Sequence, residues 1–171
     1  PQTQFAVERQ EDGVFLSANL QFELPGVVED VLLKGIPVVF VAEAEVYRDR
    51  WYWYDKKVAS AVRHLRLAYQ PLTRRWRLQA LTHASAAASQ GMTLAQTYGS
   101  LAEAVAGLQR ISRWKIAEPQ DLDPEARHNV DFRFRLDLTQ LPRLFQIGAL
   151  GHADWILATG RGQRLNMEAP R

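Results

Sequence analysis

Hydrophobic and polar residues alternate along several stretches of the chain, and this period of two predicts β-strands with one buried face. The clearest stretch is 130–138, where apolar residues alternate with aspartates and arginines. Residues 14–23 alternate in the same way, and the turn Glu11-Asp12-Gly13 separates them from a short strand over 5–9. A glycine in that turn suits a positive φ, so the two strands form a predicted hairpin.

Residues 36–47 predict a strand with an uneven pattern. Every even position is apolar, whereas the odd positions change from Val39 and Val41 to Glu43 and Glu45. We therefore expect the first half of this strand to be buried on both faces and the second half on one.

A second hairpin is predicted further along the chain. Residues 65–69 and 76–80 alternate on either side of a turn at 71–74, with arginines on the outer face. Weaker patterns predict a short strand at 114–116 and a last strand at 154–157.

Two segments have helical patterns. Residues 25–34 begin with a proline suited to a first turn and end before a glycine. Residues 100–110 begin with a capping box, Ser100 to Glu103, and apolar residues follow at helical spacing. Residues 82–97 are rich in Ala, Ser and Gln and predict a loop, with a helical turn at 84–88 as the alternative.

The strands follow one another through hairpin-length connections, which favours antiparallel pairing. The predicted fold class is α+β, mainly β: a curved antiparallel sheet or a sandwich-like meander with one or two packed helices (about 25–34 and 100–110). The 171 residues show no break in composition and 47% are hydrophobic, so we expect one domain over 1–159. The polar, glycine-rich residues 160–171 predict a flexible tail.

Composition and charge exclude several classes of function. The formal net charge is only +2, so nothing requires a nucleic-acid partner. The absence of cysteine excludes disulfides, thiol nucleophiles and cysteine-based zinc sites. No apolar run reaches the length of about 18 residues that a membrane-spanning helix needs. The chain begins at Pro1, from which we expect that an N-terminal piece has been left out.

No catalytic signature is present in the sequence, so we expect no enzyme and no cofactor. Glu43 and Glu45 project from one face of a predicted strand, about 7 Å apart, and a hydrolase could use such a pair. We favour a solvated strand face for them. The histidines are scattered, which argues against a metal site. They are His64, His83, His128 and His152.

An aromatic run is the first candidate for binding a partner or ligand. Trp51, Tyr52, Trp53 and Tyr54 can stack on sugars, hold lipid headgroups or anchor a protein if they are exposed. The alternative, which we favour, is that the tryptophans belong to the core and the tyrosines border the surface.

Arginines on the predicted strands are the second candidate. If those strands are neighbours, their guanidinium groups form a positive face for phosphate, acidic lipid or acidic protein. The alternative, which we favour, is an ordinary solvated face with Asp131, Asp137 and Glu45 as cross-strand partners. The candidate binding residues are Arg66, Arg75, Arg77, Arg133 and Arg135, with Arg63 and Arg74 beside them.

A pocket is a further possibility, because a curved sheet closed by a helix can enclose one. Phe40, Ala42 and Ala44 would line one side, and the helix at 100–110 would be the lid. Such a protein would carry or sense a hydrophobic or anionic small ligand.

Six short motifs follow one another along the chain. They are Leu33-Lys34-Gly35-Ile36-Pro37, Arg50-Trp51-Tyr52-Trp53, Leu67-Ala68-Tyr69-Gln70-Pro71-Leu72-Thr73-Arg74, Ser100-Leu101-Ala102-Glu103-Ala104, Arg135-Leu136-Asp137-Leu138 with Leu141-Pro142, and Asp154-Trp155. In this order they resemble the bacterial domain of unknown function (DUF) 4390 family, over about residues 5–157. The resemblance implies a small exported protein of Gram-negative bacteria, whose gene often lies beside a nitrogen-type two-component sensor kinase. It implies no catalytic residue.

From these observations together we expect a non-enzymatic, periplasmic interaction or accessory module linked to an envelope sensor kinase. We expect the protein to be in the periplasm, after removal of an N-terminal signal that this chain does not contain. The expected partner is an envelope protein such as a two-component sensor ectodomain. The alternative is the carrier or sensor of a small ligand, and the second alternative is a hydrolase.

Overall fold

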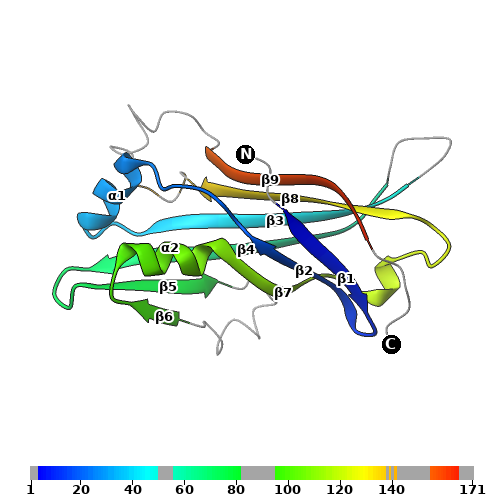
Figure 1. The fold of residues 1–171 in the computed structure, drawn as a ribbon, viewed down its shortest axis with the longest axis horizontal. Coiled ribbons are helices and arrows are strands. Elements are labelled where there is room, and N and C mark those ends of the chain that lie inside the picture. The colour runs from blue at the N-terminus through cyan, green and yellow to red at the C-terminus, as the bar shows by residue number, and fades with distance from the viewer. Residues whose placement is uncertain are drawn as a thin grey trace.

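The computed structural model describes residues 4–49, 56–81, 95–137, 139, 141 and 155–165. In this part of the chain, strands form two antiparallel sheets and two α-helices accompany them, as the predicted fold class requires (Figure 1). The smaller sheet has the order β1-β2-β7 and the larger one the order β6-β5-β4-β3-β8-β9. The elements are β1 (Phe5–Gln10), β2 (Gly13–Asn19), α1 (Gly26–Leu33), β3 (Val38–Arg48), β4 (Lys56–Gln70), β5 (Arg75–Leu81), β6 (Ala95–Tyr98), α2 (Leu101–Gln109), β7 (Arg110–Ala117), the 3-10 helix η1 (Pro119–Asp121), β8 (His128–Asp137) and β9 (Trp155–Arg164).

Strand β3 lies at the centre of the large sheet and pairs with β4 on one side and β8 on the other. In this register Ala42 lies between Arg63 of β4 and Phe134 of β8. The even-numbered residues of β3 face the core, and we call this the inner face of the large sheet. The odd-numbered residues lie on the opposite, outer face. Val39 and Val41 are buried there, as predicted.

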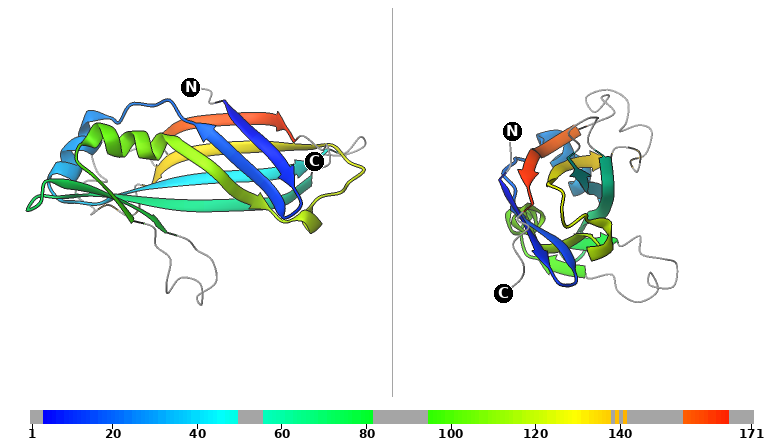
Figure 2. Two further views of the ribbon diagram at one scale, coloured as in Figure 1. Left: turned by 60° about the horizontal axis from the view of Figure 1, so that its bottom comes forward. Right: turned by 90° about the vertical axis from the view of Figure 1, so that its right-hand side faces the viewer.

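The small sheet and helix α2 lie over the inner face of the large sheet (Figure 2). Aromatic rings connect the layers. Phe5 of β1 packs on Phe132 of β8, with ring centroids 5.8 Å apart. Phe134 is fully buried and lies 5.8 Å from Phe40 and 5.4 Å from Phe22, centroid to centroid. This aromatic group holds β8, β3 and the segment after β2 together.

The turn between β1 and β2 forms the predicted hairpin and depends on Gly13. Its φ of +144° belongs to a region that is almost restricted to glycine. A Cβ added to Gly13 would lie 2.5 Å from the carbonyl oxygen of Ala117 on β7. The glycine is therefore needed both for backbone conformation and for close packing of β7.

Both predicted helices are confirmed. The hydroxyl of Ser100 accepts a hydrogen bond from the backbone N–H of Glu103 at 3.2 Å, which caps α2 as the sequence predicts. Ala104 and Leu108 bury one side of this helix. Helix α1 follows Pro25 and buries Val28, Val31 and Leu32. Neither helix of the described chain is long and apolar enough to cross a membrane.

Two loop predictions are corrected by the sheet topology. Residues 160–164 belong to β9 and pair with β8, so the expected tail does not begin at Gly160. Their sequence lacks an apolar alternation because β9 is an edge strand, whose backbone pairing needs no buried side chains. For the same reason the expected loop over 82–97 ends early, where β6 pairs with β5 from Ala95. The rest of that loop, 82–94, lies outside the described residues.

Three strands also differ in extent from their predicted ranges. Strand β2 ends at Asn19, although the alternation continues to Glu23, because the chain then leaves the ladder toward α1. Leu20 remains buried in the core. Strand β7 begins directly at the end of α2 and is longer than the predicted 114–116. Strand β4 extends back to Lys56, well before the alternating residues 65–69.

Candidate functional site

The register places the five candidate arginines on the outer face of the large sheet. Arg66 of β4 lies opposite Val39, and Arg77 and Arg75 of β5 lie opposite Ala68 and Gln70 of β4. Arg135 and Arg133 of β8 lie opposite Val41 and Glu43 of β3. The five guanidinium groups thus belong to one face but to two separate regions of it, with β3 between them.

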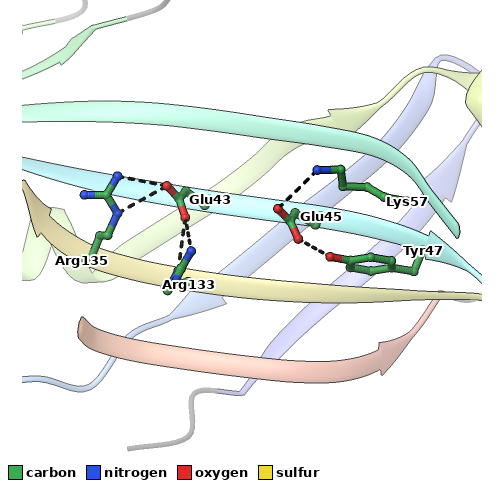
Figure 3. A network of polar contacts seen from close by, with 6 residues as sticks. All are labelled: Glu43, Glu45, Tyr47, Lys57, Arg133 and Arg135. Atoms are coloured by element: carbon green, nitrogen blue, oxygen red, sulfur yellow. Dashed lines mark hydrogen bonds and ion pairs between the residues drawn. The ribbon is translucent and has the colours of Figure 1, made fainter. Parts of the chain in front are cut away.

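The arginines of β8 are held by a single carboxylate. Arg133 donates two hydrogen bonds to one oxygen of Glu43, at 3.0 and 3.2 Å, and Arg135 donates two to the other oxygen, at 3.1 and 3.3 Å (Figure 3). Partial burial raises the pKa of Glu43, but the hydrogen bonds from Arg135 and Arg133 outweigh this effect. The net result is a pKa below the ordinary value.

The neighbouring carboxylate is also occupied. Glu45 accepts a hydrogen bond from the hydroxyl of Tyr47 and forms an ion pair with Lys57 at 3.9 Å. The hydrogen bond to Glu45 raises the pKa of Tyr47 to about 12. A hydrolase of the paired-carboxylate type needs one carboxyl group that stays protonated near neutral pH. Glu43 has the opposite tendency, so the geometry does not favour the hydrolase.

Replacing Glu43 with glutamine tests the ion-pair cluster. At neutral pH we expect Glu43→Gln to lower the free energy of unfolding by about 2 kcal/mol, because two guanidinium groups lose their shared acceptor. A lowered carboxyl pKa stabilises the fold above the ordinary value of 4.5, and this stabilisation disappears as the pH falls through the lowered pKa. Urea titrations at about pH 7 and about pH 3 should therefore show the two proteins converging in acid. Glu8→Gln, at an exposed carboxylate, is the control, and a difference that persists in acid would contradict the assignment.

The arginines on the outer face of β4 and β5 differ from those of β8 because their own strands carry no acidic residue. Residues 56–81 and 95–98, which form β4, β5, β6 and one turn, contain seven basic residues and no aspartate or glutamate. Arg66, Arg75 and Arg77 are exposed, and no carboxylate of the described chain forms an ion pair with them. We call these three residues the arginine face.

A cleft of about 510 Å³ lies on the other side of the sheet, between α2 with the start of β7 and the inner face of β4 and β5. Ala42 and Leu65 line its sheet side, and Ala106 and Gly107 line its helix side. The predicted pocket named Phe40, Ala42 and Ala44 opposite this helix, and of these Ala42 lines the cleft. The register also corrects the expectation that Arg63 belongs to the positive face, since Arg63 lies opposite Ala42 on the inner face.

The described residues contain no group of three or more His, Asp or Glu that could hold a metal ion. His128 is buried in the core, and its Nε2 accepts a hydrogen bond from the backbone N–H of Asp123 at 3.3 Å. Burial lowers the pKa of His128, which favours the neutral ring. His64 lies on the outer face of β4. His83 and His152 lie outside the described residues.

The comparisons with known proteins place the chain in a family. The profile of the family described as "Domain of unknown function (DUF4390)" matches residues 2–164. The chain belongs to the DUF4390 family. The match includes β9 up to Arg164, beyond the motifs that carry the resemblance. No curated protein and no solved structure matches the chain. The function of this DUF4390 protein therefore has to be inferred from its own surfaces.

Sequence reasoning missed one residue of these surfaces in the DUF4390 chain and placed another on the wrong face. Leu72 is fully exposed in the turn between β4 and β5, close to the arginine face. Its position in a Pro-Leu-Thr-Arg turn is a signal that could have indicated exposure. Arg63 was expected beside the arginines of the positive face but lies on the inner face. No sequence signal indicates this, because the residues before it do not alternate. The aromatic residues Trp51, Tyr52, Trp53 and Tyr54 lie outside the described residues.

Proposed function

We propose that this DUF4390 protein is a periplasmic, non-enzymatic accessory module whose arginine face binds an acidic surface of another envelope protein. The observation that carries the proposal is the complete lack of carboxylates in β4, β5 and β6, beside the exposed Arg66, Arg75 and Arg77. Unpaired guanidinium groups on a regular sheet face can each bind a carboxylate through bidentate hydrogen bonds.

The contrast between the two regions of the outer face supports this choice. Arg133 and Arg135 already have an acceptor in Glu43, and a second acidic partner would have to compete with it. The arginine face has no internal competitor in the described chain. Its positive potential would both attract an acidic partner and fix its orientation.

A protein partner suits the arginine face better than a lipid bilayer. Amphipathic surfaces that bind bilayers insert large apolar or aromatic side chains among their basic residues. Short or polar side chains such as Ala68, Gln79 and Thr97 lie among the arginines instead. The exposed large apolar residues in the described part of β4 to β6 and its turn are Val62 and Leu72, which are well separated in sequence.

The periplasmic location and the sensor kinase are supported by the family resemblance. Members of the DUF4390 family resemble exported proteins of Gram-negative bacteria, and their genes often lie beside a nitrogen-type sensor kinase. A sensor ectodomain in the same compartment is therefore the partner to test first.

Charge reversal on the arginine face tests the proposed function. The probe is the purified ectodomain of the sensor kinase encoded beside this gene, with affinity measured by biolayer interferometry at several salt concentrations. We expect Arg75→Glu with Arg77→Glu to weaken binding by at least about tenfold, and we expect added salt to weaken the wild-type complex. The matched control reverses two other exposed arginines, Arg127 and Arg161.

Three outcomes would overturn the proposal. One is that the control pair weakens binding as much as Arg75→Glu with Arg77→Glu. Another is that the arginine-face variant binds the ectodomain like the wild type. The last is that the wild-type protein does not bind the ectodomain but binds vesicles of anionic phospholipid through the same arginines. That result would make the arginine face a membrane-binding surface.

A further inference from the structure

Arg63 is a charged residue on the inner face of the large sheet, where its neighbours are apolar. It lies directly opposite the fully buried Ala42 of β3, and it is half-buried. Burial lowers the pKa of its guanidinium group, which remains charged at neutral pH because the ordinary value is 12.5. Among the described residues, no carboxylate forms an ion pair with Arg63 and no hydrogen bond holds it.

A partly desolvated charge without a partner destabilises a fold, so its presence needs an explanation. Methionine at this position would fill similar space at no electrostatic cost. Residues that reduce stability in this way are commonly retained for binding or catalysis. The environment of Arg63 therefore indicates a ligand that supplies the missing negative charge.

The cleft provides the space for that ligand. Its volume of about 510 Å³ lies within the usual range for small-molecule sites. Leu65, Leu78 and Ala80 give its sheet side an apolar surface next to Arg63. A ligand in this position would have an anionic group beside Arg63 and an apolar body along β4 and β5.

Helix α2 is shaped to leave this space open. Gly107 faces the cleft, and a Cβ added there would lie 2.5 Å from the hydroxyl oxygen of Tyr98. Tyr98 can therefore pack closely against the helix backbone instead of occupying the cleft. The charged groups that line the cleft are Arg63, Arg110 and Glu103, and Glu103 accepts a hydrogen bond from the backbone N–H of Gly99 at 3.2 Å. Positive charge thus exceeds negative charge in the lining.

We propose that the cleft under α2 binds a small amphiphilic anion, whose carboxylate or phosphate group pairs with Arg63 and whose apolar part lies against Leu65 and Leu78. This site is on the opposite side of the large sheet from the arginine face. It does not depend on the proposed protein partner, and either can fail without the other.

Calorimetric titration with three probes of equal chain length tests the site: decanoate, decyl phosphate and decanol. The two anions are kept below their critical micelle concentrations, and decanol below its solubility limit. We expect at least one of the two anions to bind the wild-type protein at least about tenfold more tightly than decanol does. Preference for decanoate would identify a carboxylate ligand, and preference for decyl phosphate a phosphate ligand. Equal binding of decanol, or no binding of either anion, would overturn the proposal.

Substitutions separate Arg63 from general apolar binding. We expect Arg63→Met to weaken binding of the preferred anion at least about tenfold. In the absence of ligand, we expect the same substitution to raise the melting temperature. A merely structural arginine would lower it. Arg75→Met, on the outer face, should leave anion binding unchanged. Ala106→Phe, at an exposed helix position that lines the cleft, should block binding while the circular dichroism spectrum stays the same. Anion binding that survives both Arg63→Met and Ala106→Phe would refute the site.

Discussion

Replacing Phe134 with alanine is expected to lower the free energy of unfolding by about 4 kcal/mol, because the ring fills a fully enclosed position. Phe134 stacks on Phe40 of the neighbouring strand with an interplanar angle of 10°, and it also contacts Phe22. Its removal leaves a cavity that two rings border, and β8 is too firmly paired with β3 to close it. For a chain of this length the loss corresponds to a fall of about 10 °C in melting temperature.

The control for this substitution is Phe134→Leu, which keeps most of the apolar volume. It should lower the free energy of unfolding by about half as much. Both variants are compared with the wild type by chemical denaturation and by thermal melting. If Phe134→Ala costs less than about 1 kcal/mol, the three rings do not form the packed group described above.

Replacing Gly13 with alanine is expected to lower the free energy of unfolding by about 3 kcal/mol, through two separate causes. A φ of +144° is strained for any residue that has a side chain. The new Cβ also meets the carbonyl oxygen of Ala117 at 2.5 Å, and a backbone atom in a paired strand cannot move away cheaply. The hairpin of β1 and β2 would shift away from β7.

Two other glycines separate these causes. Gly162 has a φ of +70° but nothing within 4 Å of an added Cβ, so Gly162→Ala should show backbone strain alone. Gly26, at the start of α1, has free space and no positive φ, so Gly26→Ala should be neutral or slightly stabilising. The expected order of melting temperatures is Gly26→Ala, Gly162→Ala, Gly13→Ala, from highest to lowest. A Gly13→Ala protein as stable as Gly26→Ala would contradict the observed turn geometry.

Alternation predicted the strands whose side chains divide between core and solvent. Strand β8 is the best example, because Phe132, Phe134 and Leu136 all enter the core while the arginines between them face outward. The same reasoning failed for β6 and for residues 160–164 of β9. These edge segments are held by backbone hydrogen bonds, which leave no pattern in the side chains.

The candidate surfaces were predictable only in part. Alternation correctly assigns Arg66, Arg77 and Arg135 to the outward side of β4, β5 and β8, but it gives no information about which strands are neighbours. The pairing of Glu43 with Arg133 joins residues 90 positions apart, and only the strand order reveals it. That pairing separates the ion-paired arginines of β8 from the arginine face. The position of Arg63 likewise depends on its register with Ala42.

The central place of β3 has a consequence for how the chain folds. Its partner β4 follows closely in sequence, whereas β8 is separated from it by the whole of β4 to β7. Closing so long a loop costs entropy before any contact of β3 with β8 compensates for it, which makes folding slow. Until β8 is in place, one side of β3 stays an open edge, able to pair with other chains. The large sheet can therefore be completed only when the last third of the chain is available to fold.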